Sequence, residues 1–233
     1  MEFEVPTGGQ RARPMRVFLL LCGIVFLTPV AQAQSTRVDA AVVHVRWHNP
    51  KTNMDCCGGT AFHVGRGMFY TNAHVIRGHP QEFTELWLFN AQRNRWVGPA
   101  EVACVDDRWA ESPTPRSGEL SPYDVALIRV VGADYPALRF SGQALGLGLG
   151  VRIVGYPVVV PQQRPSQYVA EGYIIEVDSE RFTVKILDGF GIPGSSGSPV
   201  LTATGEILGI VYGGIGSEYA VAATQSTILS GCR

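Results

Sequence analysis

The chain has 233 residues and a formal net charge of −1, with 19 basic and 20 acidic side chains. The basic residues are scattered, without a run or an aromatic-basic stripe, which argues against a protein that binds nucleic acid or a charged membrane surface. A hydrophobic fraction of 45% argues against a disordered chain, and the length suits one all-β unit or two small fused barrels.

The first part of the chain is typical of a signal peptide. An apolar run at residues 17–27 follows several arginines and is too short to span a bilayer. Residues 31–33, Ala-Gln-Ala, have the small-x-small pattern that signal peptidase recognises. We therefore expect residues 1–33 to be a signal peptide, with Met15 as an alternative translation start. After its removal we expect a secreted or periplasmic protein without a stable membrane anchor.

Four cysteines follow this leader, namely Cys56, Cys57, Cys104 and Cys232. None has the paired two-residue spacing of a zinc site. An exported protein with four cysteines is expected to form one or two disulfides, and three full pairings are possible. Neighbours such as Cys56 and Cys57 seldom bond each other, and buried free thiols are the alternative.

Short segments rich in β-branched and aromatic residues, separated by turn formers, predict two series of strands. The first series comprises residues 41–47, 59–64, 68–71, 85–89, 96–105 and 123–131. The second series comprises residues 151–156, 168–177, 181–187, 198–202, 206–212 and 219–223. A glycine-rich connector at residues 132–150 separates them, and the only helix expected lies near residues 224–230. The sequence thus predicts an all-β protein of two six-stranded halves.

Three motifs each join a polar residue to apolar strand neighbours: TNAHV around His74, YDVALI around Asp124 and GSSGSP around Ser196. A serine hydroxyl is a poor nucleophile at neutral pH. Acyl transfer therefore requires a neutral imidazole to accept its proton and a carboxylate to hold that imidazole in the right tautomer. Glycines beside the serine, Gly194 and Gly197, let backbone N–H groups point at the developing oxyanion. Each motif alone has a structural explanation, but the three together predict a catalytic triad.

These segments resemble the trypsin-like, chymotrypsin-fold serine peptidases over nearly all of residues 41–223. GTAFHVGRGMFYTNAHVI is similar to the strand pair that leads to the family's histidine, and YDVALIRV to its aspartate strand. PGSSGSPVLTATGEILGIVYGG is similar to the serine loop and the hairpin after it. The GSP version and the GI-x-x-GG ending look most like bacterial glutamyl endopeptidases and high-temperature-requirement proteases.

The resemblance implies two six-stranded antiparallel β-barrels packed side by side, at residues 34–133 and 134–233, with a short C-terminal helix. It implies a serine endopeptidase for peptide or protein substrates, with His74, Asp124 and Ser196 in the cleft between the barrels. We expect no cofactor and no metal.

The resemblance also assigns the remaining site residues. It places the oxyanion hole at the backbone amides of Gly194 and Ser196. It places the primary specificity pocket beside four residues, namely Phe190, Tyr212, Gly213 and Gly214.

Three departures from the family pattern qualify this assignment. The cysteine that animal members carry after the histidine is here Val75, which excludes the usual disulfide from Cys57. Ser195 replaces the aspartate with which zymogens pair a new N-terminal ammonium, so we expect no such activation. Val211 replaces the histidine of glutamyl endopeptidases, and we expect cleavage after small or medium aliphatic residues.

Two other classes of protein are alternatives to a trypsin-like peptidase. An α/β-hydrolase carries its acid and histidine after the serine, but neither an Asp nor a His follows Ser196. A catalytically inactive trypsin-like binding module remains as the alternative, although such proteins usually lose a triad residue and all three are present here.

Overall fold

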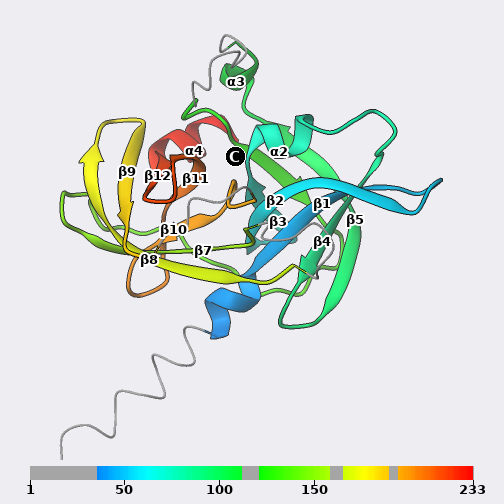
Figure 1. The fold of residues 1–233 in the computed structure, drawn as a ribbon, viewed down its shortest axis with the longest axis horizontal. Coiled ribbons are helices and arrows are strands. Elements are labelled where there is room, and N and C mark those ends of the chain that lie inside the picture. Colours follow the sequence, from blue (N-terminus) through cyan, green and yellow to red (C-terminus); the bar gives the residue numbers. More distant parts are fainter. Residues whose placement is uncertain (1–35, 112–120, 158–164, 189–193, 233) are drawn as a thin grey trace, which may run out of the picture.

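The computed structural model describes residues 36–111, 121–157, 165–188 and 194–232. The expected signal peptide at residues 1–33 and the expected pocket residue Phe190 lie outside this part of the chain. The described residues form twelve strands in two closed barrels, which lie side by side in Figure 1. The predicted all-β fold of two six-stranded antiparallel barrels is therefore confirmed.

The first barrel closes in the order β1-β2-β3-β6-β5-β4. Its strands are β1 (Val42–Asn49), β2 (Met54–Gly65), β3 (Met68–Thr71), β4 (Glu85–Asn90), β5 (Arg95–Val105) and β6 (Ala126–Arg129). The second barrel closes in the order β10-β11-β12-β9-β8-β7. Its strands are β7 (Gly150–Gly155), β8 (Tyr168–Val177), β9 (Arg181–Ile186), β10 (Pro199–Leu201), β11 (Ile207–Ile215) and β12 (Tyr219–Thr224).

Alternating side chains build the interior of each barrel. In β9, Phe182, Val184 and Ile186 are buried and the residues between them are more exposed, because successive side chains of a strand point to opposite faces. One buried cluster fills the first barrel and another fills the second. A third cluster combines residues of both barrels, including Phe62 and Tyr212, and joins the two halves through a common core.

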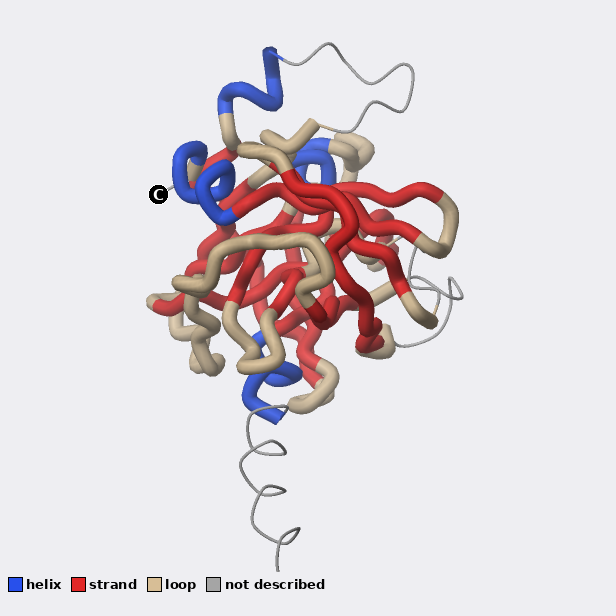
Figure 2. The backbone as a smooth tube through the Cα atoms, turned by 90° about the vertical axis from the view of Figure 1, so that its left-hand side faces the viewer, coloured by secondary structure: helices blue, strands red, loops and turns tan. Residues whose placement is uncertain are grey.

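Helices lie at the periphery of this strand body, as Figure 2 shows. The predicted C-terminal helix is present as α4 (Gln225–Gly231), where the Thr224 hydroxyl caps the first turn by accepting from the Thr227 amide. The prediction that it is the only helix is wrong. A short helix occupies residues 36–41, and α2 (Ala73–Arg77) and α3 (Asp107–Glu111) have five residues each. Helices of this length are too short for an apolar period of 3.6 residues to reveal them.

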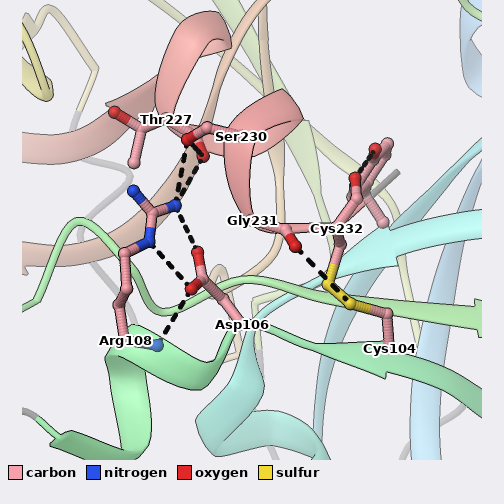
Figure 3. Close-up of a disulfide and its surroundings, with 8 residues drawn as sticks. Cys104, Asp106, Arg108, Thr227, Ser230, Gly231 and Cys232 are labelled. Carbon is pink, nitrogen blue, oxygen red and sulfur yellow. Dashed lines mark hydrogen bonds and ion pairs between the residues drawn. A yellow bond between two sulfur atoms is a disulfide. The ribbon is translucent and has the colours of Figure 1, made fainter.

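The four cysteines in the described part of the chain form two pairs. Cys104 at the end of β5 is bonded to Cys232 after α4, with their Cα atoms 5.8 Å apart (Figure 3). Cys56 is bonded to its neighbour Cys57, against the expectation that adjacent cysteines seldom bond each other. Cys57 takes a positive φ of 33° there. None of the helices in the described ranges is long and apolar enough to cross a membrane.

Candidate active site

His74 and Asp124 meet at the rim of the first barrel. The Nδ1 atom of His74 lies 2.5 Å from Oδ2 of Asp124, and the backbone amide of His74 donates to Oδ1 at 2.9 Å. The Asp124 side chain is 7% exposed, whereas that of His74 is 43% exposed. The carboxylate is thus buried behind an imidazole that reaches solvent, and one residue occupies both of its oxygens.

The local sequence explains why these two residues meet. Thr71 at the end of β3 pairs with Ala126 at the start of β6, so the chain leaves β3 beside the segment that leads into β6. Asn72 follows in an extended conformation at the N-cap of α2, which then carries His74. The side-chain amide of Asn72 donates to the carbonyl of Asp124 at 2.6 Å. The buried Asn72 therefore holds the histidine helix against the aspartate segment.

Ser196 lies in a tight turn just before β10. The amide of Ser198 donates to the carbonyl of Ser195 at 3.0 Å, and Gly197 between them has a φ of 87°. A Cβ atom at Gly197 would also overlap the carbonyl oxygen of Thr60. Both the left-handed backbone and the close approach therefore require glycine at this position.

Thr60 of β2 ties this turn to the first barrel. Its amide donates to the carbonyl of Ser196 at 2.8 Å, and its hydroxyl donates to the carbonyl of Gly194 at 3.1 Å. The same hydroxyl accepts from the amide of Tyr156, at the start of the connection after β7. The backbone amide and the side chain of one residue thus fasten the serine loop at Ser196 and at Gly194, across the boundary between the barrels.

Three of the four expected pocket residues, Tyr212, Gly213 and Gly214, lie along β11 (Ile207–Ile215). Tyr212 sits at a β-bulge between Val211 and Gly213, and its side chain is only 2% exposed, within the core shared by the two barrels. Gly213 and Gly214 pair with Val221 and Ala220 of β12. The structure therefore presents the backbone of Gly213 and Gly214 near the surface, while the Tyr212 ring points inward.

Burial governs the ionisation of Tyr212. Removal of its phenol from water raises its pKa to about 12. The nearby Arg181 guanidinium works in the opposite direction, and Asp124 contributes a small further increase of the pKa. Tyr212 is therefore a neutral group at physiological pH and supplies no charge to a pocket.

Sequence reasoning missed two residues of the site. Asn72 stands at an N-cap position, where Asn is preferred, but its side chain makes no capping bond and instead donates to the Asp124 carbonyl 52 residues away, which the local sequence does not indicate. Thr60 carries no local signal, since its partners Gly194 and Ser196 are more than 130 residues away in the chain. No group of three or more metal-ligating side chains comes together among the described residues.

Comparison with known proteins supplies the family. The active form of the Rv3671c protease of M. tuberculosis is 21% identical, with a TM-score of 0.61 over 87% of this chain and 82% of that chain. Its inactive form is 19% identical, with the same TM-score over 87% of this chain and 92% of that chain. At this identity the likeness shows the fold. The family model of the trypsin-like peptidase domain matches residues 59–210, which are more than half of the chain. The chain therefore belongs to the family of trypsin-like peptidases.

Proposed function

We propose that this serine endopeptidase is exported and cleaves peptide bonds with a triad of His74, Asp124 and Ser196. The observation that carries the proposal is the pair of hydrogen bonds from His74 to the two Asp124 oxygens. Such a pair fixes the imidazole by its Nδ1–H and leaves Nε2 for the serine hydroxyl. The leader-like pattern at residues 1–33 supports export.

The reaction then follows from these roles. Ser196 Oγ attacks the carbonyl carbon of the scissile peptide bond while His74 Nε2 takes the hydroxyl proton. The negative charge on the carbonyl oxygen is stabilised by the amides of Gly194 and Ser196. His74 next gives the proton to the leaving amine, which departs and leaves an acyl-enzyme. Water, deprotonated by the same imidazole, hydrolyses the ester and restores Ser196.

The primary pocket is proposed to accept small or medium aliphatic side chains. Val211 and its β12 partner Ala222 are apolar, and so is Ala220 opposite Gly214, so none of them offers a charge to a substrate. An apolar pocket discriminates weakly, by about 1 to 3 kcal/mol per methylene. Cleavage of a peptide library mainly after Lys, Arg or Glu would refute this assignment.

The triad is tested with an active-site-directed fluorophosphonate and a peptidase assay. Wild-type protein should be labelled at Ser196, while Ser196→Ala and His74→Ala should each lower kcat by about 10⁶-fold, as in another triad protease. Ser226→Ala, an exposed serine of α4, is the matched control and should leave kcat unchanged. A folded wild-type protein without labelling or turnover would instead favour an inactive binding module.

A further inference from the structure

Tyr123, the residue just before Asp124, contacts two side chains that lie outside the proposed triad. The phenol of Tyr123 donates to Oε1 of Glu180, and this hydrogen bond raises the pKa of Tyr123. The guanidinium carbon of Arg108 lies 4.2 Å from the centroid of the same ring, which is cation–π distance. We call these three side chains, Tyr123, Arg108 and Glu180, the latch.

Glu180 anchors the latch to the second barrel. It lies in the turn between β8 and β9, and its carbonyl accepts from the Thr224 amide and the Thr227 hydroxyl, both at 2.9 Å. Thr224 caps α4 and Thr227 is buried in its first turn. The acceptor of the Tyr123 phenol is therefore held by α4 and not by the barrel from which Tyr123 comes.

Arg108 is fixed to the same helix (Figure 3). It donates to the two Asp106 oxygens at 2.9 and 2.6 Å, to the Thr227 carbonyl at 3.1 Å and to the Ser230 hydroxyl at 3.0 Å. Asp106 is 2% exposed, and a buried carboxylate is stable only with such partners. A Cβ atom at Gly231 would overlap Asp106, so α4 approaches this pair as closely as the backbone allows.

Both chain neighbours of Asp124 are thereby tied to the network. Tyr123 is held through its side chain, and Val125 accepts from the backbone amide of Asp106 at 3.0 Å. Asp124 itself donates its amide to the Ser121 carbonyl at 3.1 Å. The backbone on each side of Asp124 is therefore held by the network of Glu180, Asp106 and Arg108. This network is bonded to α4 and to the turn before β9, in the half of the chain that carries Ser196.

We propose that Tyr123 is a positioning residue for catalysis, which holds Asp124 and hence His74 in place relative to Ser196 by joining the two barrels through Glu180. The inference rests on the proposed triad. Reacting groups must be aligned closely, and a displacement of about 1 Å costs on the order of 10²-fold in rate. His74 and Asp124 are carried by the first barrel and Ser196 by the second. The latch resists a displacement of the first pair relative to Ser196.

The first test compares Tyr123→Phe with Tyr173→Phe in the full chain. Tyr123→Phe keeps the ring beneath Arg108 and removes only the hydroxyl. Tyr173 is exposed on β8 and serves as the control. We expect Tyr123→Phe to lower kcat by about three- to tenfold with KM unchanged. We expect both variants to have the melting temperature of the wild type. A purely structural contact would give the opposite result, with a lower melting temperature for Tyr123→Phe and an unchanged kcat.

The second test is a double-mutant cycle with Glu180. Glu180→Gln keeps an acceptor oxygen and should restore near-normal kcat, whereas Glu180→Ala should match Tyr123→Phe. The combined Tyr123→Phe/Glu180→Ala variant should lose no more than either single variant, since they remove one interaction. Additive losses, or normal kcat in Tyr123→Phe with an active wild type, would overturn the latch alone. A wild type that the fluorophosphonate does not label at Ser196 would instead overturn the proposed function.

Discussion

Asp124 bonds with each of its oxygens to a different donor of the same residue, and the two donors differ in kind. One is the imidazole Nδ1 and the other is the backbone amide of His74. A backbone amide can only donate, so its bond to Oδ1 leaves Oδ2 as the acceptor for the imidazole. The imidazole is therefore oriented by the main chain of its own residue as well as by the aspartate.

This arrangement makes a specific prediction for Asp124→Asn. The new amide group has one oxygen, and whichever donor faces the NH₂ loses its acceptor. If the ring faces the NH₂, the imidazole must accept at Nδ1 and carries its proton on Nε2, where it cannot act as a base. We expect kcat to fall by about 10⁴-fold, the loss seen for this change in the template triad protease, with the fold intact by circular dichroism. A variant that retained near-normal kcat would exclude Asp124 from the triad.

His44 predicts a loss of stability in acid. Burial lowers its pKa from 6.5 to about 4, Arg46 adds to this decrease, and Asp55 opposes it. Because the unfolded chain takes up the proton at a higher pH than the folded chain, the contribution is intact above pH 6.5 and is lost as pH falls toward 4. We expect the free energy of unfolding to decrease over this range by up to about 3 kcal/mol. Urea titrations of His44→Gln should show a smaller slope with pH, and an unchanged slope would contradict the assignment.

The residues of the proposed triad were predictable because each lies in a short motif with its own chemistry. The residues that hold them were not. Thr60 acts through hydrogen bonds to carbonyls far along the chain, and Tyr123 acts through a carboxylate of the other barrel. Neither bond can be recognised from the local sequence, since every residue has a backbone carbonyl and carboxylates are common in turns.

The Cys104–Cys232 disulfide connects β5 to the segment after α4 across 128 residues. Constraining a loop of that size in the unfolded chain stabilises a protein by about 4 to 5 kcal/mol in the chain-entropy model. Cys104→Ser should therefore lower the free energy of unfolding in guanidinium by several kcal/mol. Cys57→Ser is the matched control, because adjacent cysteines close no loop. Equal effects of the two substitutions would contradict the entropic explanation.

The sequence predicted the presence of the strands better than the residues at which they begin and end. Residues 168–177 and 68–71 agree with β8 and β3, because turn residues bound these runs. β2 begins at Met54 and not at Gly59, since the β1–β2 hairpin continues its ladder through Met54 and Asn49 beyond the apolar part of the sequence. β6 begins only at Ala126, because the backbone around Asp124 turns to meet His74.

The shared core predicts that the two barrels unfold together. All four tryptophans lie in the first half of the chain, so their fluorescence reports the first barrel, whereas far-ultraviolet circular dichroism reports both. The cluster that contains Phe62, Tyr70, Ile210 and Ile228 couples these halves. We expect coincident thermal transitions by the two probes, the criterion for two-state unfolding. A circular dichroism transition that persists beyond the fluorescence transition would show independent barrels.

At the level of the whole molecule, the number and spacing of strands predicted two six-stranded halves, and the resemblance to trypsin-like peptidases implied that each half closes into a barrel. The contacts between the barrels could not be predicted, because they join residues that are far apart in the chain and have no common local motif. Tyr70 of β3, for example, donates its hydroxyl to the Cys232 carbonyl at 2.6 Å, a contact between residues 162 positions apart.

The two bonds from Thr60 have a mechanical consequence. The serine loop is covalently part of the second barrel, yet Thr60 pulls the carbonyls of Gly194 and Ser196 onto β2 of the first. The turn keeps its bonds to the second barrel as well, because the amide of Gly197 donates to the Val211 carbonyl of β11 at 2.8 Å and the amide of Val211 donates to the Ser198 carbonyl at 2.9 Å. Ser196 is therefore fastened to both barrels at once, and the two halves can slide against each other only by stretching hydrogen bonds on one side of this residue or the other.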